Sequence, residues 1–189
     1  MQNNWISGNV PVIAATVAFG KIQTSVRSNT HYFIEGMGID KSTVRFVAHW
    51  GCPSSIESYY QESGRAGRDG KQSYARIFYS EEERDTLEYI LNKHDKTKPQ
   101  DSRAARIASF KLMVQYCESS ENCRHMMISK FFLDPIPLCV DGCDICKDKS
   151  EADSRLREFM YKTSSRTGVE DNRAKRAFRT LISQKFSKY

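Results

Sequence analysis

The chain has 189 residues, and 39% of them are hydrophobic, which is enough length and apolar content for one or two domains with an ordinary core. No apolar run approaches the roughly 20 residues of a membrane span, and the first residues show no signal-peptide pattern. We therefore expect an intracellular protein with no membrane association, whose six cysteines are thiols or metal ligands rather than disulfides. The net charge of +6 favours a polyanionic partner, and residues 151–189, with ten Lys/Arg against five Asp/Glu, carry +5 of it.

The first elements predicted along the chain are strands. Residues 10–19 form a continuous run of β-branched and small apolar side chains, which is typical of a strand buried in a parallel sheet. Residues 42–50 alternate with the period of two that a strand requires. Pro53 ends this second strand, and the spacing of Ser54 and Glu57 predicts a capping box at the start of a helix.

A glycine-rich turn with two arginines follows this helix at residues 64–68, and we call it the arginine turn. Arg65 and Arg68 stand three residues apart, with Gln61 before them. Guanidinium groups bind phosphate oxygens bidentately, and glycines such as Gly64 let the backbone approach an anion. Gly-Arg runs also occur in flexible basic loops, but the strands predicted before and after this run place it in a folded α/β unit. The pattern therefore predicts an anion site.

The chain then changes from α/β to helical character. A strand at 73–79 and a helix at 81–93 complete the α/β part, and the charged, proline-containing stretch 96–100 is typical of a linker. Beyond the linker, apolar residues at helical spacing predict four helices, two on each side of a loop at 134–147 that is rich in Pro, Gly and Cys. These helices are expected at 103–118, at 122–132, around 156–160 and around 174–182.

Four cysteines in the second half of the chain have the spacing C-x15-C-x3-C-x2-C, which strongly indicates a metal site. A soft dication takes four thiolates at tetrahedral corners, and a glycine-containing knuckle places three of them around one ion while a helix supplies the fourth. Buried structural thiols or a disulfide are alternatives, and His125 is a possible replacement for one thiolate. Cys117 fits the apolar stripe of a helix, and Cys52 lies beside a turn. The predicted ligands are Cys123, Cys139, Cys143 and Cys146.

These patterns resemble one known family. The string YYQESGRAGRDG at residues 59–70 resembles motif VI of superfamily 2 helicases, and in particular the RecQ family of DNA helicases. The cysteine arrangement resembles the zinc-binding subdomain that follows the motor in RecQ proteins. Residues 15–20 and 37–41 together resemble motif V of the family once residues 21–36 are set aside. The chain looks most like the short animal members that lack a winged helix.

The sixteen-residue segment 21–36 has three interpretations. It is a tolerated surface loop, because the entropy of loop closure grows only with the logarithm of length, or a functional element of one lineage. We prefer a third hypothesis, a retained short intron, because sixteen codons keep the reading frame and the segment has no helical or strand period of its own. Sequencing the transcript across codons 15–42 would decide between them.

The resemblance implies an α/β fold in three parts. Residues 1–95 would be a truncated RecA-like C-terminal helicase lobe, with a parallel sheet and helices and with an insertion at 21–36. Residues 101–148 would be a helical RecQ-type zinc-binding subdomain, in which four protein ligands leave no open position, so that the Zn²⁺ would be structural. Residues 149–189 would be a basic helical tail.

The resemblance also assigns roles to the residues of the arginine turn. Arg65 and Arg68 would reach across the cleft between two lobes to the γ-phosphate of ATP, where they would stabilise the charge of the transition state. Gln61 would couple nucleotide chemistry to movement, and Gly64 would lie beside the nucleotide.

ATP and Mg²⁺ in RecQ motors are bound by a Gly-x-x-x-x-Gly-Lys-Ser/Thr loop and an Asp-Glu-x-His box on the first lobe, and neither string occurs in this chain. We therefore expect ATP and Mg²⁺ to bind only together with an absent N-terminal lobe, and the chain alone to be inactive as an ATPase. Gly38 and Asp40 would lie near this nucleotide and Thr16 near the DNA backbone, but an insertion at 21–36 would move the first two away from the third. Asp40 would then merely cap a turn.

The expected macromolecular partner is DNA, held through its backbone without sequence specificity. The tail has an apolar stripe beside a basic face, so a partner protein would suit it equally well. Candidate DNA contacts are Arg103, Arg106, Lys111, Arg124, Lys130, Arg173, Lys175, Arg176 and Arg179.

The sequence is thus interpreted as the C-terminal part of a RecQ-like 3′ to 5′ helicase that couples ATP hydrolysis to DNA unwinding, with nuclear roles in repair and recombination implied by the family. The competing interpretation is a non-catalytic short isoform, a zinc-stabilised module that holds DNA or a protein. An incomplete gene prediction with no independent function is a third. A DNA-stimulated ATPase assay of the purified chain separates the first two.

Overall fold

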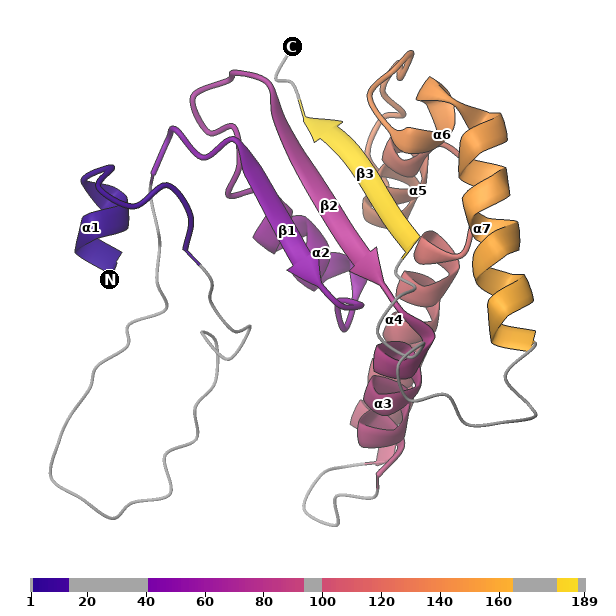
Figure 1. Cartoon of the computed structure of the whole chain (residues 1–189). Coiled ribbons are helices and arrows are strands. Elements are labelled where there is room, and N and C mark those ends of the chain that lie inside the picture. Colours follow the sequence, from indigo (N-terminus) through magenta and orange to yellow (C-terminus); the bar gives the residue numbers. More distant parts are fainter. Residues whose placement is uncertain (1, 14–40, 94–99, 165–179, 187–189) are drawn as a thin grey trace, which may run out of the picture. The chain divides into compact units, whose positions relative to one another are not determined.

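The computed structural model describes residues 2–13, 41–93, 100–164 and 180–186, and the chain divides into two compact units, Met1–Lys41 and Ser42–Tyr189 (Figure 1). Where the structure describes it, the first unit contains one short helix, α1 (Gln2–Ile6), which the sequence did not predict. Trp5 is buried in this unit, because the Lys41 ammonium lies 4.7 Å from its ring centroid and also donates to its carbonyl oxygen.

The strand predicted over residues 10–19 is wrong in the part that the structure describes. Residues 10–13 have no strand pairing, and Val10 and Val12 are exposed to solvent. A run of apolar residues becomes a buried strand only when neighbouring strands pair with it, and composition alone does not ensure that pairing. Residues 14–19 lie outside the described part of the chain.

The second unit is built on a three-stranded sheet in the order β1 (Phe46–Trp50), β2 (Ser73–Tyr79) and β3 (Thr180–Phe186). β1 and β2 are parallel and paired over five residues. Parallel neighbours need a crossover connection, which here contains α2 (Ile56–Ser63) and the arginine turn. The strand predicted at 73–79 is confirmed, and the one predicted at 42–50 is shorter at its start than expected.

The helix predicted around residues 174–182 is wrong at its end, because Leu181 and Ile182 lie in β3. β3 pairs antiparallel with β2 over seven residues, with Thr180 opposite Tyr79. The free edge of β2 offers a row of backbone N–H and C=O groups, and pairing with such an edge overrides the local helical spacing. The expected basic helical tail is therefore helical only in its first part within the described residues.

The other helices of the second unit confirm four predicted ones and add a short one between them. The capping box predicted for α2 begins one residue late: the N-cap of α2 is Ser55 rather than Ser54, and the Ser55 hydroxyl accepts a 3.1 Å hydrogen bond from the backbone N–H of Ser58. No helix in the described ranges has the length and apolarity to cross a bilayer. The helices are α3 (Glu81–Asn92), α4 (Gln100–Cys117), α5 (Arg124–Phe132), α6 (Asp144–Lys147) and α7 (Lys149–Ser164).

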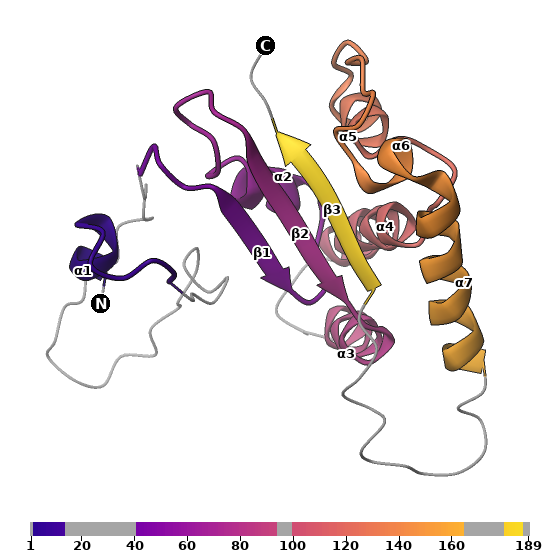
Figure 2. The same cartoon turned by 45° about the horizontal axis from the view of Figure 1, so that its top comes forward.

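The hydrophobic core lies on one face of this sheet, the face that α2 and α4 cover in Figure 2. Ala75, Ile77 and Tyr79 of β2 are buried there among side chains from α2, α4, α5 and α7. On the opposite face, Phe46 and Trp50 of β1 are exposed. α5, the helix that begins after Cys123, therefore shares a core with the strand that follows the arginine turn.

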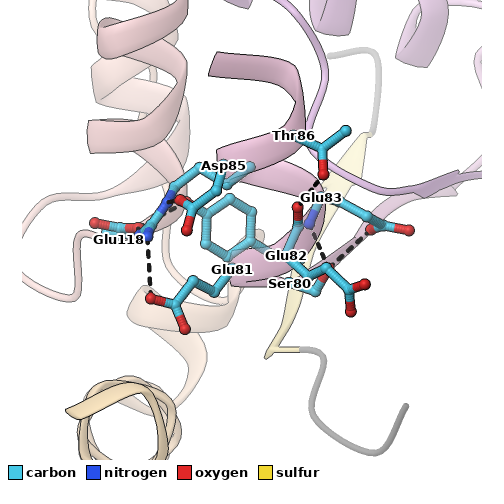
Figure 3. Close-up of polar contacts among 9 residues, drawn as sticks. Ser80, Glu81, Glu82, Glu83, Asp85, Thr86 and Glu118 are labelled. Carbon is cyan, nitrogen blue, oxygen red and sulfur yellow. Dashed lines mark hydrogen bonds and ion pairs between the residues drawn. The ribbon is translucent and has the colours of Figure 1, made fainter. Parts of the chain in front are cut away.

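A polar network joins β2 to α3 and to the end of α4 (Figure 3). The carboxylate of Glu118 accepts a 2.6 Å hydrogen bond from the Tyr79 hydroxyl and a 2.7 Å hydrogen bond from Arg84. Arg84 also pairs with Glu81 in the first turn of α3. Burial and the hydrogen bond to Glu118 raise the pKa of Tyr79, so its hydroxyl is a donor at neutral pH. The network holds the helical part against the sheet.

Candidate metal centre and arginine turn

The four predicted cysteine ligands converge on one point. Cys123 is the N-cap residue of α5 and Cys143 that of α6, Cys146 lies inside α6, and Cys139 lies in the loop that precedes it. The four sulfur atoms all lie within 4.8 Å of one another, and those of Cys123 and Cys143 are 3.9 Å apart. A tetrahedral site with Zn–S bonds of about 2.3 Å needs sulfurs about 3.8 Å apart. The cluster therefore fits a zinc ion bound by four thiolates.

The electrostatics of the cluster also favour a cation. Burial raises the pKa of the Cys143 thiol, but hydrogen bonds with His125 and with the backbone N–H of Cys146 outweigh burial and bring this pKa down to about 6. Burial and the neighbouring Cys143 raise the pKa of Cys139 to about 11. The cluster thus holds one thiol that ionises easily and another that resists ionisation beside it. A dication removes that resistance, because it neutralises the repulsion between thiolates.

A buried ion pair supports the metal cluster. Arg124 and Asp144 directly follow two of the predicted ligands in the sequence, and they are only 3% and 8% exposed. The guanidinium donates to both carboxylate oxygens, at 3.0 Å and 3.2 Å, and also to the backbone carbonyl of Tyr116. The prediction that Arg124 contacts DNA is therefore wrong, because its guanidinium is paired with the Asp144 carboxylate inside the protein and its side chain does not reach the surface.

The ion pair connects the metal cluster to the helix before the arginine turn. The guanidinium of Arg124 lies 5.2 Å from the centroid of the Tyr116 ring, and that ring lies 5.4 Å from the ring of Tyr59 in α2. Both tyrosines are fully buried. A series of buried contacts therefore links the knuckle around the cysteines to α2.

The arginine turn brings its predicted residues together at the end of α2. Gln61 and Arg68 are exposed, Arg65 is half-buried, and Gly64 forms the C-cap. Gly67 has φ 70°. Its N–H donates a 3.0 Å hydrogen bond to the carbonyl of Val44, two residues before β1. The two arginines thus lie on a tightly bonded turn.

Two hydrogen-bonded side-chain pairs, which the sequence analysis missed, hold this turn at both ends. At its start, the Glu62 carboxylate lies 2.8 Å from Nε2 of His49 in β1, a histidine that is buried. At its end, the Asp69 carboxylate lies 2.7 Å from the guanidinium of Arg45, which also donates to the carbonyl of Ser42. The hydrogen bond from Arg45 lowers the pKa of Asp69. The partners are separated by 13 positions in the first pair and by 24 in the second, so no local spacing in the sequence indicates either pair.

The other predicted contacts divide into three groups. Lys111 on α4 and Lys130 on α5 are exposed, as DNA contacts require, whereas Arg103 and Arg106 are half-buried. The motif V candidates Thr16, Gly38 and Asp40, together with the segment 21–36, fall outside the described residues. The tail candidates Arg173, Lys175, Arg176 and Arg179 fall outside them as well.

Comparisons with known proteins define the class. Residues 5–70 match the helicase conserved C-terminal domain, and residues 81–147 match the RecQ zinc-binding region, so the chain carries a C-terminal helicase domain followed by a RecQ zinc-binding region. The chain belongs to the RecQ family of DNA helicases. This confirms the resemblance and the α/β fold class inferred from the sequence.

Similar proteins come from animals, fungi and bacteria. Over 87% of its length the chain is 40% identical to ATP-dependent DNA helicase Q5 of Mus musculus, and over 78% it is 37% identical to ATP-dependent DNA helicase RecQ of Haemophilus influenzae. It is 32% identical over 84% of its length to ATP-dependent helicase SGS1 of Saccharomyces cerevisiae. It spans only 16%, 21% and 10% of these relatives.

Proposed function

We propose that this chain provides the nucleotide-sensing arginines and the zinc scaffold of a RecQ-type helicase that couples ATP hydrolysis to 3′ to 5′ DNA unwinding. The observation that carries the proposal is the arginine turn, in which Arg65 and Arg68 lie on a short turn bonded at one end to His49 of β1 and at the other to Arg45, the residue before β1. Guanidinium groups held in this way act on the charge that develops on a transferring phosphoryl group, because they need no reorganisation at the moment of reaction. Gln61, exposed on the last turn of α2, would couple that step to movement, and Gly64 would border the nucleotide.

The nucleotide pocket itself would come from another lobe. The phosphate loop and acidic box that hold ATP and Mg²⁺ are not in the 189 residues, so we propose that the chain is a non-autonomous part of the motor. Zn²⁺ would be held by Cys123, Cys139, Cys143 and Cys146 as a structural ion, since four protein ligands leave no position for a reacting water.

The proposed division of the chain follows these roles. Residues 1–95 would form the partial helicase lobe, 101–148 the zinc-binding subdomain, and 149–189 a tail with α7 and β3 that is available to a protein partner. DNA would be bound along its backbone by exposed lysines such as Lys111 and Lys130, with an affinity that falls as salt rises. A protein with this activity would act in the nucleus, in DNA repair and recombination.

The test compares the chain alone with the chain fused behind the first lobe of a RecQ relative. The chain alone should show no DNA-stimulated ATP hydrolysis, and the fusion should hydrolyse ATP. In the fusion, Arg65→Ala or Arg68→Ala should lower kcat by about 10³-fold, as loss of an arginine finger does. Arg76→Ala, on an exposed position of β2, is the matched control and should leave kcat unchanged. Turnover by the chain alone, or full activity of both arginine variants, would contradict the proposal.

The second candidate is a non-catalytic binding module, and one observation favours it. The second unit has a core of its own, formed by β2 with α2, α4, α5 and α7. If the fusion lacks ATPase activity while the zinc-loaded chain binds DNA with the expected salt dependence, this function replaces the motor.

A further inference from the structure

We propose that His125 is a positioning residue of the metal centre, which hydrogen-bonds to the Cys139 thiolate and fixes this ligand without binding the metal itself. The inference rests on the zinc ligands of the proposed function and not on its ATPase part. Nδ1 of His125 lies 3.2 Å from Sγ of Cys139, which is hydrogen-bond distance for a nitrogen and a sulfur. With its proton on Nδ1, a neutral imidazole donates to the thiolate.

Cys139 is the ligand that needs such support most. The other three are fixed by helices, since Cys123 and Cys143 are N-cap residues and Cys146 lies within α6. Cys139 lies in the loop between α5 and α6, and both of its sequence neighbours are exposed. No helix or strand holds its backbone. The hydrogen bond from His125, which is anchored in the first turn of α5, therefore ties the loop ligand to a helix.

The packing around the imidazole is consistent with a built contact. A Cβ added at Gly142 would lie 3.0 Å from Cε1 of His125 and 3.2 Å from Sγ of Cys139. The backbone of Gly142 is not in the left-handed region, so its conformation does not require glycine. The absence of a side chain at this position instead makes room for the imidazole and the sulfur.

The hydrogen bond should change the chemistry of the bound thiolate. A thiolate that accepts an N–H bond donates less electron density to the metal and attacks electrophiles more slowly, because part of its charge is already stabilised. Groups in this outer position typically account for about 10- to 100-fold in metal affinity. His125 thus has an effect that can be measured in the metal itself, without any ATPase assay.

The experiment uses the full 189-residue chain, loaded with Zn²⁺ or Co²⁺, and the variants His125→Phe and His125→Asn. His125→Phe keeps a planar ring but removes the donor, and it should weaken zinc binding about tenfold in a chelator competition. His125→Asn keeps an N–H donor and should recover most of that loss. In the cobalt form, the thiolate-to-cobalt charge-transfer band of His125→Phe should move to lower energy, while the d–d bands keep the pattern of four sulfur ligands. Arg157→Gln, at an exposed position of α7, is the control and should change neither quantity.

Three results would overturn the inference. Zinc affinity and the charge-transfer band of His125→Phe equal to those of the unmodified chain would show that the hydrogen bond has no role. Cobalt d–d bands typical of three sulfurs and one nitrogen in the unmodified chain would make His125 a ligand. No zinc binding by the unmodified chain would refute the ligand assignment of the proposed function as well. If His125→Phe does not fold, His125→Ala, which removes the donor without adding bulk, should show the same spectral shift and decides the question.

Discussion

Replacement of Arg124 by alanine tests the view that the ion pair with Asp144 supports the metal cluster. The substitution leaves the Asp144 carboxylate, 8% exposed, without its cation and leaves the Tyr116 carbonyl without its donor. Breaking one side of a buried ion pair destabilises a protein by about 3–5 kcal/mol. We therefore expect the unfolding equilibrium constant of the zinc-loaded chain to rise by about 10²- to 10⁴-fold.

The assay is urea unfolding of the full chain in excess zinc, followed by circular dichroism. Arg157→Ala is the matched control, because this arginine also pairs with an aspartate, Asp153 at 3.1 Å, but is 71% exposed. An exposed pair of this kind contributes about 0–1 kcal/mol. The double variant Arg124→Met/Asp144→Leu should regain most of the lost stability, because no unpaired charge remains buried. The reasoning is refuted if Arg124→Ala is no less stable than Arg157→Ala, or if the double variant is as unstable as Arg124→Ala.

Three further outcomes follow from the fold. Gly67→Ala should destabilise the chain by about 1–3 kcal/mol in urea unfolding, because φ is 70° and the new Cβ would lie 2.5 Å from a buried serine hydroxyl. Glu118→Ala should cost more than Tyr79→Phe, since only the former leaves a buried hydroxyl without its acceptor, and an equal cost would contradict this. The pKa of Asp69 is lowered in the folded chain, so ionised Asp69 contributes its full stabilisation of the fold above the ordinary carboxyl pKa, and this stabilisation is lost as pH falls through the lower folded pKa. In a titration of unfolding free energy against pH, Arg45→Gln should remove this loss of stability at acid pH.

The two main features of the candidate site were predictable because each is short in sequence. The arginine turn lies within a single loop, and three of the four cysteines lie within eight residues, so their spacing alone brings the chemistry together. The core helices were predictable for a similar reason, because the helical period of apolar residues describes a local face. The α/β class followed from the same local patterns.

The features that sequence reasoning missed or placed wrongly depend on partners far along the chain. Leu181 and Ile182 fit a helical stripe, but pairing with β2, about 100 residues earlier, makes them a strand. Arg124 has the same composition signal as a DNA-binding arginine, and only its position next to a predicted ligand, mirrored by Asp144, suggests a buried pair. The burial of Arg124 and Asp144 arises only in the folded chain, where the cysteine loop packs against α5.

Removal of the metal should loosen α2 as well as the knuckle. The chain of contacts runs from the cysteines through Asp144 and Arg124 to Tyr116 and Tyr59, and its middle members are buried. Because metal binding and folding of such a site are linked, a strong chelator should open α5 and α6 and withdraw the support of the Tyr116 ring.

Hydrogen exchange measured by mass spectrometry, with and without the chelator, detects this change segment by segment. Amides of α2 should exchange faster after zinc removal, whereas those of the paired strands β1 and β2, which are also held by the Glu118 network, should change less. Faster exchange confined to α5 and α6, with α2 unchanged, would mean that the metal supports only its own knuckle. An effect that reaches α2 would instead mean that zinc sets the position of Arg65 and Arg68, the residues on which the proposed chemistry depends.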